Sequence, residues 1–447
     1  MRDDAAAVVP VDAAEGALDA RVLIVGAGHA GVSAARELRR LGHRGCITLQ
    51  GDEPHFPYER PPLSKEVVRG RGMTEAAPLL TRDELAALNI VFRPGRRVRK
   101  LDIDQRMAYA DDGDAQVFDL CLLATGGQAR EFAGLPANSP GVHYVRALSD
   151  AKRLGEALAD VDSLLVLGAG YLGLEVASSA VGLCKKVTVL DVAPRILSRA
   201  APALLADWLG ARCRQAGIRV LLGQQAISIV QENGCRVVSL SDGTSVDATA
   251  IVVAVGQQPS TMLAREAGLD IDPLNGGVMV DAHCRTSAPG VYAAGDCVSQ
   301  YHPWYGGRVR LESWQSANEQ GAIVAAAMLG NTPAERGVPW FWTDVLGCNI
   351  QMLGSVPEHG DISYLQRAAL DPDAERPKGL LLGMSRGRLV HAVAVNSGGD
   401  LRVLRPLLEQ MASVDAGVLL DETKPLRTIV KRQLEGAMAA IEGGLVS

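Results

Sequence analysis

The chain has 447 residues, of which 47% are hydrophobic and 21% charged, and its formal net charge is −6. This length allows two or three domains with full cores, and the composition is typical of a globular protein. The negative balance without long basic runs argues against a nucleic-acid partner, and no apolar stretch predicts a membrane span. We expect residues 1–20, which lack the basic segment of a signal peptide, to form a flexible tail, and we expect a cytoplasmic location.

The first predicted unit is a strand, a glycine turn and a helix. An apolar run at 21–25 precedes the fingerprint Gly26-Ala27-Gly28-His29-Ala30-Gly31, a helix is expected to about residue 41, and a second strand at 46–49. The first glycine of such a motif forms the tight turn and the second lets a pyrophosphate approach the backbone. The third lets the helix pack on the strand, with its N-terminus toward the phosphates. This pattern predicts a dinucleotide-binding fold.

A carboxylate at the end of the second strand holds the adenosine ribose in this fold. Gln50 occupies the expected place, and Asp52 and Glu53 follow at once. If the strand runs slightly longer, Asp52 or Glu53 would hold the adenosine ribose. The alternative is an ordinary acidic turn.

A Pro-rich segment, Tyr58-Glu59-Arg60-Pro61-Pro62-Leu63-Ser64-Lys65, comes next. We expect Ser64 to cap a following helix, which would place Lys65 on its first turn, where the helix dipole does not favour a cation. A lysine there either meets a negative charge, such as a reduced flavin, or is simply solvated.

A second fingerprint follows the apolar run 164–167: Gly168-Ala169-Gly170-Tyr171-Leu172-Gly173. Two such motifs, each between a strand and a helix, predict that the chain holds two dinucleotides and moves electrons between them. Asp191 ends the next predicted strand and would repel a 2′-phosphate, which favours NADH over NADPH. Arg195 lies nearby and could in principle accommodate that phosphate.

Three more glycine turns follow predicted buried strands: Ala124-Thr125-Gly126, Gly256-Gln257-Gln258-Pro259 and Gly295-Asp296. Asp296 could accept hydrogen bonds from ribityl hydroxyls, and the alternative is the Gly-Asp pair of an ordinary loop. From about residue 337 short alternating strands precede a helix near 401–411, which predicts a separate α+β domain. The eight cysteines have neither CxxC nor metal-ligand spacing, so we expect no metal site and no redox disulfide.

The ordered set GAGHAG, YERPPLSK, ATG, GAGYLGLE, AVGQQP, GVYAAGDC, RLESWQSANEQG and PWFWTD resembles the FAD-dependent ferredoxin reductases of bacterial oxygenase systems. This family includes putidaredoxin reductase, rubredoxin reductase and the reductase components of aromatic-ring dioxygenases. The resemblance covers about residues 21–400. It implies an α/β, glutathione-reductase-like fold with two Rossmann-type dinucleotide-binding domains and a C-terminal α+β domain. We expect an FAD-binding domain at 21–126 and 257–330, an NAD-binding domain at 127–256 and the C-terminal domain at 335–447.

The resemblance also implies site residues. Lys65 would lie near the flavin N5 and pair with Glu175, which also meets the nicotinamide, and these two are the predicted catalytic residues. Further cofactor-binding residues implied by the matching motifs are Arg60, Arg130, Glu312, Ser313, Trp314 and Trp342. Thiol-dependent relatives carry a reactive cysteine after the second strand, where this chain has PPLSK, which argues against disulfide reductase chemistry.

The resemblance implies an NADH:ferredoxin oxidoreductase. It would pass a hydride from NADH to FAD, then single electrons to a [2Fe–2S] ferredoxin, including the Rieske type, that serves a Rieske oxygenase or a P450 in aromatic hydrocarbon catabolism. The alternatives are an NADH oxidase or quinone reductase of the same fold, and an NADH-sensing redox binding protein. A homodimer is among the expected assemblies.

Overall fold

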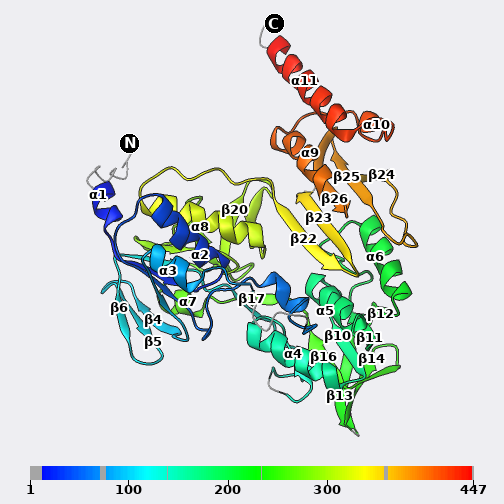
Figure 1. Cartoon of the computed structure of the whole chain (residues 1–447), viewed down its shortest axis with the longest axis horizontal. Coiled ribbons are helices and arrows are strands. Elements are labelled where there is room, and N and C mark those ends of the chain that lie inside the picture. The colour runs from blue at the N-terminus through cyan, green and yellow to red at the C-terminus, as the bar shows by residue number, and fades with distance from the viewer. Residues whose placement is uncertain (1–12, 71–76, 138, 233, 357–360, 445–447) are drawn as a thin grey trace, which may run out of the picture. The chain divides into compact units, whose positions relative to one another are not determined.

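A computed structural model of the chain describes residues 13–70, 77–137, 139–232, 234–356 and 361–444 (Figure 1). Residues 1–12 of the predicted flexible tail lie outside these ranges, and a short helix, α1 (Ala13–Leu18), occupies most of the remainder. The chain folds into two compact units. The first unit comprises Met1–Glu59, Ala77–Gln128 and Gln258–Arg336, and the second comprises Arg60–Ala76, Ala129–Gln257 and Gly337–Ser447.

The first unit is built on a five-stranded sheet whose strands are parallel, in the order β19-β7-β1-β2-β3. These strands are β1 (Val22–Val25), β2 (Ile47–Gln50), β3 (Ile90–Arg93), β7 (Leu120–Leu123) and β19 (Val291–Ala293). The central strand β1 is buried on both faces, which explains its uninterrupted apolar sequence. Val22 and Ile24 belong to one core and Leu23 and Val25 to another.

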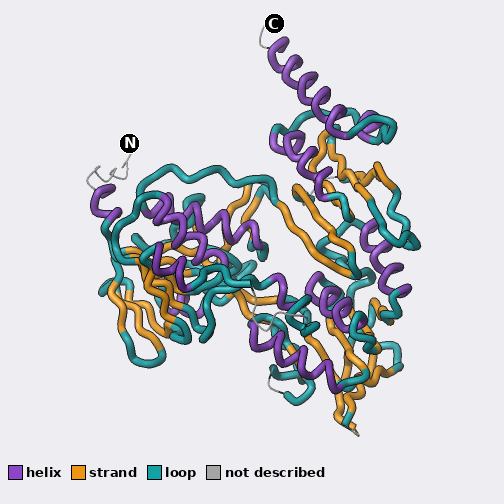
Figure 2. The backbone as a smooth tube through the Cα atoms, in the orientation of Figure 1, coloured by secondary structure: helices purple, strands orange, loops and turns teal. Residues whose placement is uncertain are grey.

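Helices α2 (His29–Arg40) and α8 (Trp314–Met328) lie side by side over one face of this sheet (Figure 1). Strands β4 (Val98–Asp102), β5 (Met107–Ala110) and β6 (Ala115–Val117) form a separate antiparallel sheet, seen in Figure 2 as its own group of strands. The rest of the unit consists of α3 (Arg82–Ala87), α7 (Met262–Glu266), β18 (Val278–Val280), β20 (Val298–His302) and β21 (Gly307–Val309). Strands β8 (Gly127–Ala129) and β17 (Gln257–Pro259) pair where the chain passes between the units.

The second unit contains another parallel sheet, in the order β12-β11-β10-β16-β9. Its strands are β9 (Val142–His143), β10 (Ser163–Leu167), β11 (Lys186–Asp191), β12 (Arg219–Leu222) and β16 (Ala250–Val253), and its helices are α4 (Leu148–Asp160), α5 (Tyr171–Val181) and α6 (Ala203–Gln215). An antiparallel sheet of β13 (Ala226–Glu232), β14 (Cys235–Leu240) and β15 (Ser245–Ala248) packs against it, sharing its apolar core.

The C-terminal part of the second unit is an antiparallel sheet in the order β22-β23-β26-β25-β24. Its strands are β22 (Trp340–Val345), β23 (Cys348–Gly354), β24 (Ser363–Ala368), β25 (Gly379–Ser385) and β26 (Arg388–Val395), followed by the helices α9 (Gly398–Glu409), α10 (Ala416–Leu419) and α11 (Leu426–Gly444). This is the α+β arrangement that the short alternating strands predict. Among the described residues no helix is both long enough and apolar enough to cross a membrane.

Candidate functional site

The two fingerprints have the same local geometry, which explains their glycines. Gly26 has φ +115°, and a Cβ there would lie 2.1 Å from the carbonyl oxygen of Ala124. Gly168 has φ +107°, and a Cβ would lie 2.3 Å from the carbonyl oxygen of Ala254. Both positions combine a left-handed backbone with direct contact to the neighbouring strand, so only glycine fits.

The third glycines set how closely each helix approaches its strand. A Cβ on Gly31 would lie 2.1 Å from the Gly26 carbonyl oxygen, and one on Gly173 would lie 2.0 Å from that of Gly168. Nothing lies within 4 Å of a Cβ on the second glycines, Gly28 and Gly170. In each turn the first and third glycines contact the protein backbone, whereas the second glycine leaves space for a pyrophosphate.

Each open glycine is also the N-cap of a helix, α2 or α5, and a glycine has no side chain that could accept a hydrogen bond from the first N–H groups of that helix. The first backbone N–H groups of a helix point along its axis and favour an anion. Ala30 is buried in the first turn of α2, and Leu172 is half-buried in the first turn of α5. These two cradles fit the pyrophosphates of two dinucleotides.

The acidic position after the second strand differs between the units. The Asp191 carboxylate accepts hydrogen bonds from the backbone N–H of Ala169, at 2.7 Å, and of Ala193, at 2.8 Å. It is therefore fixed against the glycine turn, and its binding of a ribose stays a prediction. In the first unit β2 ends at Gln50, and a Cβ on the next residue, Gly51, would lie 3.0 Å from the Ala27 Cβ.

The two acidic residues after Gly51 lie beyond the strand. Asp52 is exposed, and Glu53 accepts a hydrogen bond from the Tyr58 hydroxyl at 2.5 Å. The Gln50 side chain is buried and its amide nitrogen donates to the Arg96 carbonyl, while its amide oxygen, Oε1, has no hydrogen-bond partner among the described residues. This unpartnered acceptor at the end of β2 suits a hydroxyl donor such as an adenosine ribose.

The glycine turns predicted at the ends of other strands support both cradles. Gly126, Gly256 and Gly295 all have positive φ, at 65°, 105° and 86°. The Thr125 hydroxyl donates to the carbonyl of Ser260, and the Gly256 carbonyl accepts from the Arg130 backbone N–H at 2.9 Å. Asp296 follows Gly295 directly and is half-buried in the first unit.

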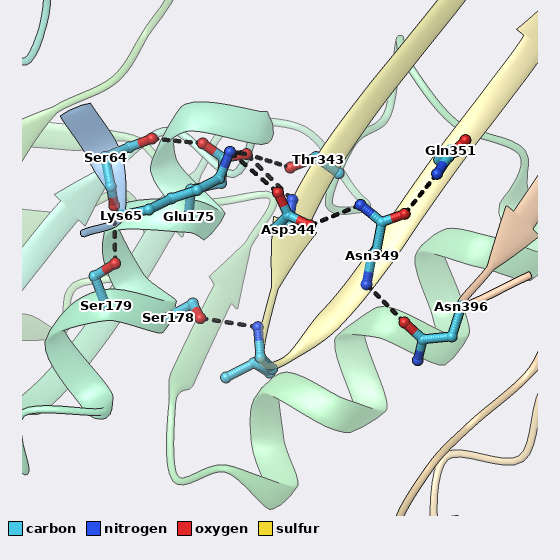
Figure 3. Close-up of polar contacts among 11 residues, drawn as sticks. Ser64, Lys65, Glu175, Ser178, Ser179, Thr343, Asp344, Asn349, Gln351 and Asn396 are labelled. Carbon is cyan, nitrogen blue, oxygen red and sulfur yellow. Dashed lines mark hydrogen bonds and ion pairs between the residues drawn. The ribbon is translucent and has the colours of Figure 1, made fainter. Parts of the chain in front are cut away.

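A buried ion pair lies in the second unit (Figure 3). Lys65 Nζ is 3.1 Å from Glu175 Oε1, and each side chain is only 10% exposed. The other Glu175 oxygen, Oε2, accepts from the Ser64 hydroxyl at 2.5 Å, and Oε1 also accepts from the Thr343 hydroxyl at 2.6 Å. Lys65 and Glu175, far apart in the sequence, lie in contact, as the family resemblance implies. Charge and hydrogen bonds fix both of them.

The local structure around Lys65 corrects one sequence expectation. Pro61–Ser64 form a 3-10 helix, and Lys65 is the residue that ends it. Ser64 does not cap a following helix, and Lys65 does not lie on a first helical turn. Two consecutive prolines fix φ near the helical value, so the short helix begins at Pro61. The Ser64 hydroxyl is then engaged by Glu175.

The remaining predicted residues divide between the units. In the first unit His29 Nε2 is 2.7 Å from Glu59 Oε2, which also accepts from the Trp314 indole N–H at 3.2 Å. Ser313 caps α8 through its hydroxyl, and Glu312 forms an ion pair with Arg310. In the second unit Arg60 donates to the Arg146 carbonyl at 2.7 Å. The Tyr171 hydroxyl donates to the Ala200 carbonyl at 2.8 Å.

A cavity of about 480 Å³ lies in the C-terminal part of the second unit. The stacked indoles of Trp340 and Trp342, 5.0 Å apart, form one wall. Two arginines of α9, Arg402 and Arg405, lie on another side. In the described part of the chain Arg402 has no carboxylate within ion-pair distance, and Arg405 has Glu409 at 3.8 Å. The cavity therefore combines aromatic surface with positive charge.

All eight cysteines are free. Burial raises the pKa of Cys121 and of Cys213 to about 12 and that of Cys284 to about 11. These three thiols stay protonated near neutral pH and are poor nucleophiles. In the described part of the chain no group of three His, Cys, Asp or Glu side chains is arranged to hold a metal ion.

Three polar residues were not predicted to belong to this site. They are Thr343, Asp344 and Ser64, whose hydroxyl donates to Glu175. The Asp344 backbone N–H lies 3.3 Å from Glu175 Oε1, and its carboxylate is 3.4 Å from Lys65 Nζ. Thr343 and Asp344 directly follow Trp342, in the PWFWTD segment, so proximity to a predicted site residue was the available signal. Their contact with Glu175 required the packing of β22 on α5.

Family models match most of the chain. The model described as pyridine nucleotide-disulphide oxidoreductase matches residues 20–321, and the model described as reductase C-terminal matches residues 340–430. The chain is 36% identical over 398 residues to the 3-phenylpropionate/cinnamic acid dioxygenase ferredoxin–NAD(+) reductase component of Photorhabdus laumondii, covering 89% of this chain and 98% of the relative.

Two further similarities agree with these. The chain is 36% identical to the rubredoxin-NAD(+) reductase of Pseudomonas putida, covering 76% of this chain and 87% of that protein. It also resembles the crystal structure of the covalent putidaredoxin reductase–putidaredoxin complex, with a TM-score of 0.86 and 31% identity, over 94% of this chain and 99% of that one. The predicted glutathione-reductase-like fold with a C-terminal domain is confirmed.

Proposed function

Because the chain belongs to the pyridine nucleotide-disulphide oxidoreductase family, we propose that it is an NADH-dependent, FAD-containing reductase of a ferredoxin. The observation that carries this proposal is the buried Lys65–Glu175 pair in a chain with two open glycine cradles. The relatives named ferredoxin–NAD(+) reductase components and the putidaredoxin complex support the choice of acceptor.

We assign FAD to the first unit. The turn of Gly26, Gly28 and Gly31 and the start of α2 would hold its pyrophosphate. Asp52, Glu53 or the side-chain Oε1 of Gln50 would hold its adenosine ribose. Asp296 would bind the ribityl chain, and the segment Glu312–Trp314 would line the ring. When bound, FAD accepts a hydride from NADH and releases the electrons one at a time.

We assign NADH to the cradle of Gly168, Gly170 and Gly173. Asp191, already fixed by two backbone N–H groups, would accept from the ribose hydroxyls of the adenosine and repel a 2′-phosphate. Arg195 belongs to the same unit and is the residue that would favour a 2′-phosphate.

Lys65 and Glu175 are the proposed catalytic residues. The Lys65 ammonium would stabilise the negative charge that develops on the acceptor ring, and Glu175 would hold the lysine and orient the nicotinamide. Ser64 and Thr343 donate hydrogen bonds to the two oxygens of Glu175, which holds the carboxylate group in one orientation. Preorganised charge of this kind lowers the barrier because no rearrangement is needed during reaction.

We propose that the ferredoxin docks over the cavity at Trp340 and Trp342. Arg402 and Arg405 supply positive charge there for an acidic partner, although the whole chain is net negative. The sequence alone suggests Arg308 and Arg310 for this role, with Arg386 and Arg388 on the C-terminal hairpin. In the structure, however, Arg308 donates to the carbonyls of Val280 and Ser299, and Arg310 pairs with Glu312. Reversing Arg402 and Arg405 to glutamate should raise the KM for ferredoxin and leave ferricyanide reduction unchanged.

We further propose a cytoplasmic enzyme that serves a Rieske oxygenase or a P450, with a Rieske-type ferredoxin among the candidate acceptors. The relatives named for aromatic-acid dioxygenase systems support this setting. A homodimer stays a prediction, which light scattering on the purified protein would check.

The deciding experiment is turnover by the purified, FAD-loaded protein. We expect rapid NADH oxidation only when a [2Fe–2S] ferredoxin is present. Rapid oxidation with oxygen or a quinone alone would contradict the proposal and indicate an oxidase. Slow turnover with a persistent reduced complex would indicate an NADH-sensing protein. Lys65→Met should slow flavin reduction in stopped flow and leave the NADH dissociation constant nearly unchanged.

A further inference from the structure

A second carboxylate contacts Lys65. Its Nζ lies 3.1 Å from Glu175 Oε1 and 3.4 Å from Asp344 Oδ2. Glu175 belongs to α5 of the nucleotide-binding fold, whereas Asp344 belongs to β22 of the C-terminal sheet. Figure 3 shows Glu175 and Asp344 converging on the lysine from these two elements. The C-terminal part therefore completes the environment of the proposed catalytic lysine.

The two carboxylates are held in different ways. Glu175 is 10% exposed and its two oxygens are held by Ser64 and Thr343, so it has little freedom to move. The Asp344 side chain is 42% exposed and would be free to rotate toward water unless something else held it. The structure supplies that restraint from the neighbouring strand.

The restraint on Asp344 comes from the residue opposite it on the paired strand β23. Asp344 lies opposite Asn349, and Trp342 lies opposite Gln351, so these side chains share one face of the β22–β23 pair. Asn349 Nδ2 donates to Asp344 Oδ1 at 2.7 Å, and Gln351 Nε2 donates to Asn349 Oδ1 at 2.7 Å (Figure 3). The Gln351 carbonyl oxygen in turn accepts from the Trp340 indole N–H at 3.2 Å.

The chemistry of the two ends fixes the direction of this chain of hydrogen bonds. A carboxylate only accepts and an indole N–H only donates, so both amides between them must point the same way. Flipping either amide would place two donors or two acceptors face to face. The relay Trp340–Gln351–Asn349–Asp344 is therefore a single ordered path from the wall of the cavity to the ammonium of Lys65.

We propose that Asp344 is a positioning residue, which holds Lys65 in place through this relay and makes its position depend on the C-terminal cavity. The inference rests on the proposed function, because it assumes that Lys65 acts on the bound flavin. It goes beyond that function by giving the C-terminal sheet a part in the reductive half-reaction as well as in docking.

The test is a set of double-mutant cycles on the FAD-loaded protein. Asp344→Asn should slow the stopped-flow rate of flavin reduction about threefold to fivefold, the loss expected for one partly exposed ion pair. The KM for NADH should change much less. Asn349→Ala should slow the rate about twofold to threefold by releasing Asp344 while leaving every charge in place.

The decisive comparison is with a chain that lacks the lysine. In Lys65→Met both substitutions should have no further effect on the rate, and Asn349→Ala should add nothing to Asp344→Asn. Asp400→Asn, a matched change on α9 outside the relay, should leave the rate unchanged. Equal slowing in the presence and absence of Lys65 would show that Asp344 merely supports the fold, and would overturn the proposal.

A second readout does not depend on turnover. Asn349→Ala should make the midpoint potential of bound FAD more negative, because a less ordered Lys65 stabilises reduced flavin less, and the shift should vanish in Lys65→Met. An unchanged potential in both backgrounds would overturn the proposal. If the unmutated protein is not reduced by NADH, the proposed function fails, while this equilibrium measurement still decides whether the relay acts through Lys65.

Discussion

The two glycine fingerprints share a backbone geometry but differ in what their helices carry. Two residues beyond the third glycine stands Ser33 in the first unit and Glu175 in the second. The Ser33 hydroxyl donates to the Asn318 carbonyl at 2.8 Å and joins α2 to α8. Glu175 instead meets Lys65 and Ser64. One helix position thus serves packing in one unit and chemistry in the other.

The strand ends differ in the same way. Asp191 follows Leu190, whose carbonyl accepts from the Gly168 N–H. In the first unit the Gln50 carbonyl accepts from the Gly26 N–H, so the residue equivalent to Asp191 is Gly51. The shared parts of the motif are those that backbone contact dictates. The parts that differ are those that select a cofactor and act on it.

The largest expected effects come from substituting the glycines that the two fingerprints share. Gly173→Ala and Gly31→Ala should each lower the free energy of unfolding by about 3 kcal/mol or more, because the new Cβ would meet backbone oxygen. Gly170→Ala and Gly28→Ala, where a Cβ meets nothing, should keep normal stability and weaken NADH and FAD binding respectively. Urea unfolding and cofactor titration check this, and equal destabilisation by all four would contradict it.

The next largest effects are expected at Glu175 and at Ser33, which occupy the same helix position in the two units. Glu175→Gln should slow flavin reduction by NADH about tenfold to a hundredfold, because it removes the charge that holds Lys65. Ser33→Ala should leave that rate unchanged and lower stability by about 1 kcal/mol through the lost hydrogen bond. Stopped flow and thermal unfolding separate the two. A slowed reduction in Ser33→Ala would show that α2 shares the catalytic role.

A smaller effect is expected from the acidic residues at the two strand ends, Asp191 and Asp52. Asp191→Ser should lower kcat/KM for NADH about tenfold and raise it for NADPH, since the repelling carboxylate is lost. Asp52→Ser in the first unit should leave the NADH/NADPH ratio unchanged. The measurement is kcat/KM for both nucleotides. If Asp191→Ser keeps the original ratio, Arg195 or another residue sets the preference.

The smallest effect concerns pH. Burial would raise the pKa of Glu59, but its hydrogen bonds with His29 and Trp314 outweigh burial, and the pKa lies below the usual 4.5. A depressed carboxyl pKa contributes stability that is present above pH 4.5 and is lost as the pH falls through the folded value. The contribution should stay below about 1 kcal/mol because the pair is partly exposed.

Glu59→Gln should therefore cost more stability at pH 7 than at pH 3, as measured by urea unfolding. In the second unit Tyr171 takes the place of His29, and its hydroxyl donates to the Ala200 carbonyl. Tyr171→Phe should thus show the same stability loss at both pH values. A pH-dependent loss in Tyr171→Phe would contradict this distinction.

The sequence predicts the features of this molecule that depend on local constraint. Glycine spacing, strand burial and the carboxylate at Asp191 follow from rules that act within about 25 residues. The Lys65–Glu175 contact spans distant parts of the chain and was available only through family resemblance. The roles of Ser64 and Thr343 could not be read in that way, because a hydroxyl suits a cap, a turn or a buried carboxylate equally well. Only the packing of α5 decides between them.

The cysteines limit how many electrons the protein can store. All eight are free, and burial keeps the pKa of Cys121 and Cys213 near 12. Because the chain carries PPLSK where thiol-dependent relatives have a reactive cysteine, we expect the electron pair from one NADH to leave from the flavin. A one-electron carrier then has to visit twice for each NADH consumed. Release of the carrier between visits becomes part of every cycle, so a ferredoxin that binds too tightly would slow the enzyme.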